Sequence, residues 1–172
     1  GVGIQCEFSF PTIQNCIIIN NIVDSNGGGI YIQESDVMFI DTEIYQNSGS
    51  SGGGIYAVGS NISLNKVLLA NNHSTLDGAA LYMMQTDLDL NQVTITENVA
   101  EDDAGAIYLR YSSSVSILNS ILWNNGPQEI VFSPVGGENF VEIYYSDLAG
   151  GVSAIETNNN GGTTFGLTNV II

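Results

Sequence analysis

Hydrophobic and polar residues alternate in short segments along most of the chain, and no segment has the three-to-four-residue apolar spacing of an amphipathic helix. Typical segments are residues 62–64 (ISL) and 67–69 (VLL), and residues 88–90 (LDL) and 93–95 (VTI). Residues that favour turns, mainly Gly, Asn, Ser and Asp, separate them. The pattern therefore predicts short β-strands connected by turns.

This pattern repeats at nearly constant intervals along the chain. A glycine-rich element recurs at residues 1–4 (GVGI), 27–31 (GGGIY), 52–56 (GGGIY), 78–82 (GAALY) and 104–108 (AGAIY). Its last apolar residues, Ile4, Ile30, Ile55, Leu81 and Ile107, have spacings of 26, 25, 26 and 26. A row of asparagines with spacings of 26, 25 and 26 follows, namely Asn21, Asn47, Asn72 and Asn98, and Asn125 continues it after one inserted residue. Such a period indicates a solenoid whose coils stack on one another.

Three short strands in each repeat of about 25 residues predict a right-handed parallel β-helix of six to seven coils. We expect one domain over residues 1–172, with regular coils in residues 1–125 and irregular coils in residues 126–172. Alternation places Ile30, Ile32, Val37 and Phe39 inside, and the asparagine row is expected to form an amide ladder between coils. The chain begins within a repeat and finishes on residues 169–172 (NVII), so unpaired coil edges are expected at both ends.

The repeat resembles that of polymorphic outer membrane proteins, in the pectate-lyase-like β-helix superfamily. Residues 27–30, 52–55, 78–81 and 104–107 match its G-G-A-[ILV] element, and residues 18–21, 44–47, 69–72, 95–98 and 122–125 match its F-x-x-N element. Ile or Leu replaces Phe throughout, so the likeness is to the wider class of secreted β-helix repeat proteins, over residues 1–132. The resemblance implies an extracellular or cell-surface scaffold, often adhesive, and no particular ligand.

The charge of the chain excludes several functions. Eighteen acidic residues face only two basic ones, Lys66 and Arg110, so the formal net charge is −16. Nucleic-acid binding needs clustered Lys and Arg, and anionic membranes would repel this surface in the absence of a bridging cation. No run of ~18 apolar residues occurs, so no membrane span is expected.

A row of tyrosines, Tyr31, Tyr56, Tyr82 and Tyr108, follows the glycine elements. Alternation with inward residues predicts four outward, exposed rings that would stack on glycans or pack against another protein. The alternative is that stacked aromatic rings stabilise adjacent strands.

Acidic residues suggest two further kinds of site. Asp36 and Asp87 share an outward row, and Asp89 lies about 7 Å from Asp87 along the same strand, a separation found in inverting glycosidases. The alternative is a solvated acidic face, and a lyase would lack a basic cleft. Asp77 and Asp103 are expected to face each other one coil apart, where Ca²⁺ would relieve their repulsion; plain solubility charge is the alternative.

Cysteine and histidine add little chemistry. Cys6 and Cys16 both fall at inward positions of the first coil, as buried thiols or as a disulfide, and export favours the disulfide. His73 has no second histidine or cysteine pair nearby in sequence, so no zinc site is expected.

The expected function is therefore a non-catalytic extracellular or cell-surface β-helix with a structural or adhesive role. Unpaired coil edges would allow copies to associate head to tail as fibre subunits, and another surface protein or glycans are the other expected partners. The alternatives are a carbohydrate-binding module and a fragment of a polysaccharide-degrading enzyme that acts through Asp36, Asp87 or Asp89.

Overall fold

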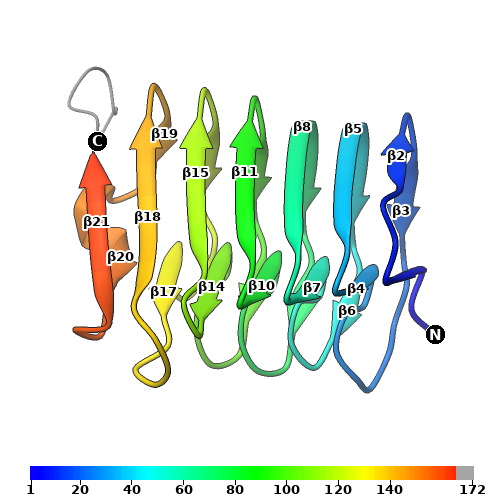
Figure 1. Cartoon of the computed structure of the whole chain (residues 1–172), viewed down its shortest axis with the longest axis horizontal. Helices are drawn as coiled ribbons and strands as arrows, with labels where there is room; N and C mark the ends of the chain where they lie inside the picture. Colours follow the sequence, from blue (N-terminus) through cyan, green and yellow to red (C-terminus); the bar gives the residue numbers. More distant parts are fainter. Residues whose placement is uncertain (166–172) are drawn as a thin grey trace.

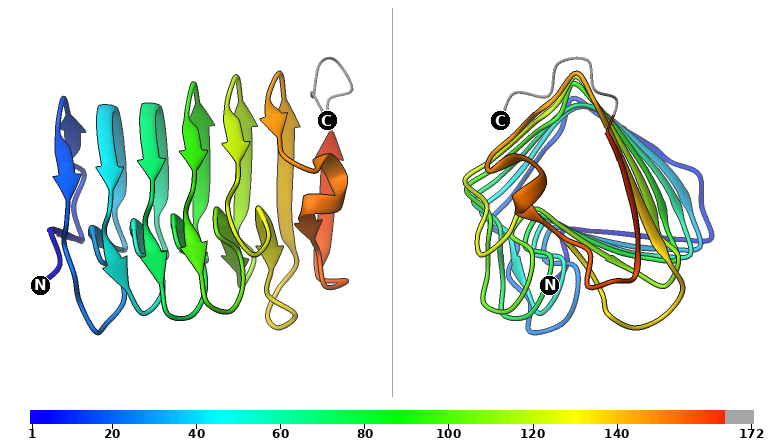
Figure 2. Two further views of the ribbon diagram at one scale, coloured as in Figure 1. Left: turned by 180° about the vertical axis from the view of Figure 1, so that it is seen from behind. Right: turned by 90° about the vertical axis from the view of Figure 1, so that its left-hand side faces the viewer.

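The computed structural model describes residues 1–165 and confirms a parallel β-solenoid with a roughly triangular cross-section (Figures 1 and 2). Every pairing between its strands is parallel. Residues 169–172, which were expected to form an unpaired edge, lie outside the described residues.

Three sheets run along the axis. The first contains β1 (Ile4–Glu7), β4 (Ile30–Gln33), β7 (Ile55–Val58), β10 (Leu81–Met84), β14 (Ile107–Arg110), β17 (Ile130–Phe132) and β20 (Ile155–Glu156). The second contains β2 (Thr12–Gln14), β3 (Ile17–Ile19), β5 (Asp36–Tyr45), β8 (Asn61–Ala70), β11 (Asp87–Asn91), β12 (Thr94–Thr96), β15 (Ser114–Leu118), β16 (Ile121–Trp123), β18 (Asn139–Tyr144), β19 (Asp147–Leu148) and β21 (Gly161–Phe165). The third contains β6 (Ser48–Gly49), β9 (His73–Ser74) and β13 (Val99–Ala100), and a 3-10 helix, η1, covers Gly151–Ala154.

The predicted second and third strands of a coil differ in one respect from the structure. In β5 and β8 they form one continuous strand of 10 residues that bends at Asp41 and Lys66, where φ is 46° and 55°. The backbone amide groups on both sides of each bend keep their partners in the neighbouring coils, so the strand turns a corner without losing its ladder.

Each coil turns its corners at residues in the left-handed region. In the second coil these are Glu34, Asp41 and Gln46, with φ of 46°, 46° and 55°, and the same corners recur in the coils that follow. This backbone conformation costs a residue with a side chain about 1–2 kcal/mol of conformational free energy. The stacked ladders on either side of each corner hold it in place, which gives the solenoid its triangular outline (Figure 2).

The core is one column of apolar side chains inside the coils, as alternation predicts. Ile30, Ile32, Val37 and Phe39 are all buried, and the same rows continue through the later coils. The glycine-rich turns allow close approach between coils: a Cβ atom at Gly53 would collide with the carbonyl oxygen of His73 in the next coil. Coil stacking therefore supplies both the core and its close packing.

The predicted asparagine ladder is present, and each of its side chains is hydrogen-bonded to the next one. The side-chain amide of each asparagine donates to the Oδ1 atom of the next, over 2.9 Å, 3.1 Å, 2.9 Å and 2.8 Å from Asn21 to Asn125. The same Oδ1 atoms also accept the backbone amide of the preceding asparagine. Each coil is thus tied to the next by a buried polar row as well as by its core.

Cys6 and Cys16 do not form the disulfide that was expected for an exported protein, because both are free. Cys6 lies on β1 in the first sheet, whereas Cys16 immediately precedes β3 in the second sheet. Alternation correctly places both residues toward the inside, but on different sides of the coil. Burial raises the pKa of the Cys6 thiol.

Candidate functional site

The outer face of the second sheet carries a groove along the solenoid axis. It crosses the strands β5, β8, β11, β15 and β18, which lie side by side in Figure 1. A hollow of about 450 Å³ includes Asp36, Asn61, Asp87 and Asp89 in its lining, and a second of about 220 Å³ shares Asp87 and Asp89. The two hollows adjoin at Asp87 and Asp89, and together they are called the groove here.

The predicted row of Asp36 and Asp87 is confirmed. Asn61 lies between them, because it is paired with Asp36 in β5 and with Asp87 in β11. The side-chain amide of Asn61 donates to Asp36 Oδ1 over 2.7 Å, and the hydroxyl of Ser114 in the next coil donates to Asp87 Oδ1. Asp87 and Asp89 are both exposed, whereas a glycosidase holds its general acid in a buried environment.

The tyrosine row is also present, but its predicted exposure is wrong. Tyr31, Tyr56, Tyr82 and Tyr108 stack with successive ring centroids 5.6 Å, 4.8 Å and 5.2 Å apart. Tyr56, Tyr82 and Tyr108 are only 9%, 4% and 6% exposed, and Tyr31 alone is half-buried. The rings therefore offer little free surface to a glycan, which favours the alternative interpretation that they stabilise the sheet.

The turns that precede the strands explain this burial. A Cβ atom at Gly52 would lie 2.7 Å from the Cβ of Tyr56, and one at Gly78 would lie 3.1 Å from the Cβ of Tyr108, so the glycine turns pack directly on the tyrosine row. Arg110 covers part of it too, since its Nη1 donates to the hydroxyl of Tyr82 over 3.3 Å. Burial raises the pKa of both Tyr56 and Tyr108.

Asp77 and Asp103 lie near each other in neighbouring turns. The pKa of Asp77 is raised, first by burial and then by the negative charges of Asp103 and Asp102. Within residues 1–165, no group of three or more His, Cys, Asp or Glu side chains is arranged to hold a metal ion. Binding of Ca²⁺ by this pair stays a prediction.

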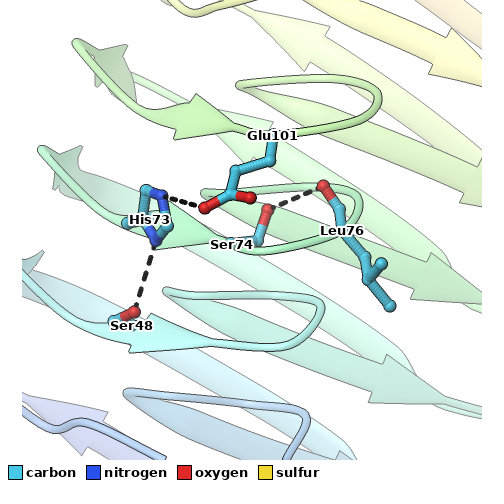
Figure 3. A network of polar contacts seen from close by, with 5 residues as sticks. All are labelled: Ser48, His73, Ser74, Leu76 and Glu101. Atoms are coloured by element: carbon cyan, nitrogen blue, oxygen red, sulfur yellow. Dashed lines mark hydrogen bonds and ion pairs between the residues drawn. The ribbon is translucent and has the colours of Figure 1, made fainter. Parts of the chain in front are cut away.

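A polar network on the third sheet links three coils (Figure 3). The hydroxyl of Ser48 lies 3.4 Å from His73 Nδ1, and His73 Nε2 lies 3.5 Å from Glu101 Oε1. The order of hydroxyl, imidazole and carboxylate is that of a hydrolase triad. However, the neighbouring backbone amides of Ser48 and Ser50 donate to ladder carbonyls, so they provide no oxyanion hole. The contacts of His73 with Ser48 and Glu101 tie neighbouring coils together.

Three features of the structure escaped the sequence analysis. A second ladder is formed by Ser9, Ser35, Ser60, Thr86 and Ser113, in which each backbone amide donates to the next side-chain oxygen. The regular spacing of these hydroxyl residues, one in each repeat, was a visible signal. Phe10 and Phe140 are the second feature. Phe10 lies one coil before Asp36 at the same position of the repeat, and Phe140 lies one coil after Ser114 at the same position. Both therefore extend the row that contains Asp36 and Asp87.

The third feature is Glu129, which closes the asparagine ladder. Its carboxylate oxygens accept the backbone amide of Asn125 over 3.1 Å and the side-chain amide over 2.6 Å, so it takes the place of a sixth asparagine. It is 4% exposed. Burial raises the pKa of this carboxyl, although both hydrogen bonds oppose that shift. The shortened coil after Asn125 moved the residue out of the regular period and concealed it.

Coils, core and ladders together define a parallel β-helix repeat protein. The family model described as right handed beta helix region matches residues 1–171, so the chain belongs to this family. No curated protein and no solved structure matches the chain. Among the described residues, none forms a helix of the length and apolar character needed to cross a membrane.

Proposed function

We propose that the chain is a non-catalytic extracellular or cell-surface β-helix whose rigid coils display an adhesive or structural surface. The observation that carries this proposal is the unbroken amide ladder from Asn21 to Asn125, closed by Glu129. Because each rung joins adjacent coils inside the core, bending the solenoid would break buried hydrogen bonds. Such a body suits a stalk or a scaffold that holds binding groups at fixed spacing.

Association of copies is part of this proposal. β1 pairs only with β4, and β2 and β3 pair only with β5, so each has one free edge within the part of the chain that the structure describes. A further coil, from a second copy or from a longer polypeptide, would pair with these edges through backbone hydrogen bonds. The exposed side chains of Phe8, Ile17 and Ile22 in the same coil would gain cover from such an addition.

The groove on the second sheet supports a second candidate function, the binding of a carbohydrate. Its exposed carboxylates and hydroxyls suit hydrogen bonding to sugars, and its length across five strands suits an extended chain. Cleavage has less support than binding, because Asp87 and Asp89 are both open to solvent.

The test compares the chain with its Asp87→Asn variant on a panel of neutral, acidic and amino polysaccharides. We measure new reducing ends and unsaturated ends after prolonged incubation. The scaffold proposal expects none above the level without protein. Release of sugar that the substitution abolishes would overturn it in favour of the enzyme.

Negative-stain electron microscopy over a concentration series tests association of copies. Filaments of uniform width are expected, and dispersed rods at all concentrations would contradict association.

A further inference from the structure

Two outward rows form the floor of the groove. The first contains Asp36, Asn61, Asp87, Ser114 and Phe140, and the second contains Met38, Ser63, Asp89, Ser116 and Glu142. Phe10 precedes Asp36 in the first row, because the amide of Asp36 donates to the carbonyl of Ser9 as the amide of Phe140 donates to that of Ser113. Adjacent members of a row are one coil apart, about 4.8 Å.

The acidic residues do not fill these rows evenly. Asp36 lies on β5, Asp87 and Asp89 lie on β11, and Glu142 lies on β18, so carboxylates occur on every second coil. The intervening strands β8 and β15 contribute only neutral Asn and Ser to the two rows. The carboxylates therefore recur about 9.6 Å apart along the axis, twice the distance between coils.

The neutral coils hold the acids in place. Asn61 donates to one oxygen of Asp36, and Ser114 donates to one oxygen of Asp87. Among the described side chains, these are the hydrogen bonds that engage the two carboxylates, and in each case the other oxygen receives none. Two carboxylates two coils apart are thus oriented, with an acceptor left for a ligand.

Uncovered apolar side chains stand at both ends of the first row. Phe10 is 80% exposed and Phe140 is 49% exposed, and Met38 beside the row is 45% exposed. Five inter-coil steps separate the two phenylalanines, about 24 Å. Aromatic faces at this distance would stack on the two ends of an extended ligand and would also attract a cation placed over the ring.

We propose that this groove binds a β-1,4-linked glucosamine polymer with free amino groups, laid along the solenoid axis. The inference deepens the proposed adhesive function by naming the ligand class of the surface. Neither Lys66 nor Arg110 lines the two hollows, so a cationic chain meets carboxylates and no opposing positive charge there.

The repeat of such a polymer fits the rows. In an extended β-1,4-linked chain successive sugars are turned over, so amines on one side recur once per disaccharide. One sugar residue is about as long as the distance between adjacent coils along the axis. Amines that face the groove therefore recur every second coil, as the carboxylates do. A neutral glucan of the same shape would lack the ammonium groups, and an N-acetylated chain would replace them with uncharged amides.

The experiment measures binding by isothermal titration calorimetry at mildly acidic pH, where the amines of the glucosamine polymer are protonated. The probes are the β-1,4-linked glucosamine hexamer, its fully N-acetylated counterpart, cellohexaose and hexalysine. The expected order places the glucosamine hexamer first, with an affinity that falls as salt rises from about 0.02 M to about 0.2 M.

Variants assign the binding to the groove. Replacing both Asp87 and Asp89 by Asn is expected to weaken binding of the glucosamine hexamer about tenfold, and Phe140→Ala about two- to fivefold. Glu43→Gln is the matched control for Asp36→Asn: both residues are exposed on β5, but Glu43 lies beyond the bend. Circular dichroism verifies that each variant is folded.

Each outcome decides the matter. Binding that prefers the glucosamine hexamer, and that Asp36→Asn weakens while Glu43→Gln does not, supports the inference. Equal loss in both variants, a preference for the N-acetylated hexamer or cellohexaose, or hexalysine binding of equal strength overturns it. Parallel analysis of the sugars keeps the two proposals apart: cleavage of a bound hexamer would contradict the non-catalytic scaffold alone, whereas absence of binding would contradict this inference alone.

Discussion

Removal of one rung of the asparagine ladder tests how the coils are held together. Asn98 is fully buried, and its Oδ1 accepts both the backbone amide and the side-chain amide of Asn72 over 2.9 Å. Its own amide donates to the carbonyl of Leu69 over 3.0 Å and to Asn125 Oδ1 over 2.8 Å. Asn98→Ala removes all of these bonds and leaves the backbone amide of Asn72 without a partner.

The expected cost is about 3–5 kcal/mol, because a typical hydrogen bond contributes about 1 kcal/mol net and a buried donor left unpaired costs about 1–3 kcal/mol. Asn98→Asp should cost more at neutral pH, because the new oxygen would face the carbonyl of Leu69 and Oδ1 of Asn125. Its deficit should shrink as acid protonates the carboxyl, which would then donate in place of the amide.

Urea denaturation followed by far-ultraviolet circular dichroism measures these changes in the free energy of unfolding. The control is Asn65→Ala, since Asn65 lies on β8 with its side chain on the outer, half-buried side of the strand. A loss below about 1 kcal/mol for Asn98→Ala, or a loss equal to that of Asn65→Ala, would refute the view that the ladder holds the coils together.

Two further predictions concern Tyr82 and Glu129. Tyr82→Ala should lower the free energy of unfolding by about 3–5 kcal/mol, because the buried ring stacks on both neighbouring rings. Tyr82→Phe should lower it by about 1 kcal/mol, because only the hydrogen bond from Arg110 is lost. Equal thermal midpoints for the two variants would contradict this. Since the pKa of Glu129 is raised in the fold, its contribution to stability is greatest when it is protonated and decreases from about pH 4 upward. Urea titrations over this range should therefore show the native chain losing stability relative to Glu129→Gln, and parallel pH curves would be contrary to expectation.

The repeat made most of the fold predictable. Its nearly constant length assigns each residue to a row, so the positions of Asn47, Asp36 and Asp87 in neighbouring coils follow by addition. Alternation then decides which side chains enter the core. These inferences succeed because every coil obeys the same geometry, and the pairing registers of β5, β8 and β11 bear them out.

The failures have two physical causes, both limits of what alternation can tell. Alternation tells whether a side chain points into its own coil, but it carries no information on what lies over the outer side. The path of the glycine turns over Tyr56 and Tyr108 depends on backbone conformation at Gly52 and Gly78, where φ is 64° and 62°. Alternation also does not tell on which side of the coil an inward residue lies: Cys6 is on β1 of the first sheet, whereas Cys16 precedes β3 of the second sheet.

The exposed outer rows are the places where this fold can meet a ligand. An inward side chain has neighbours from the coils on either side of it, so apolar side chains fill the interior of the described coils. On the outside, a compact ligand would touch only a few coils, whereas a polymer with a matching repeat would meet every coil of the groove. Phe10, Phe140 and the acids on alternate coils break the uniformity of these rows. That break distinguishes a site of defined length and charge from a surface that merely repeats.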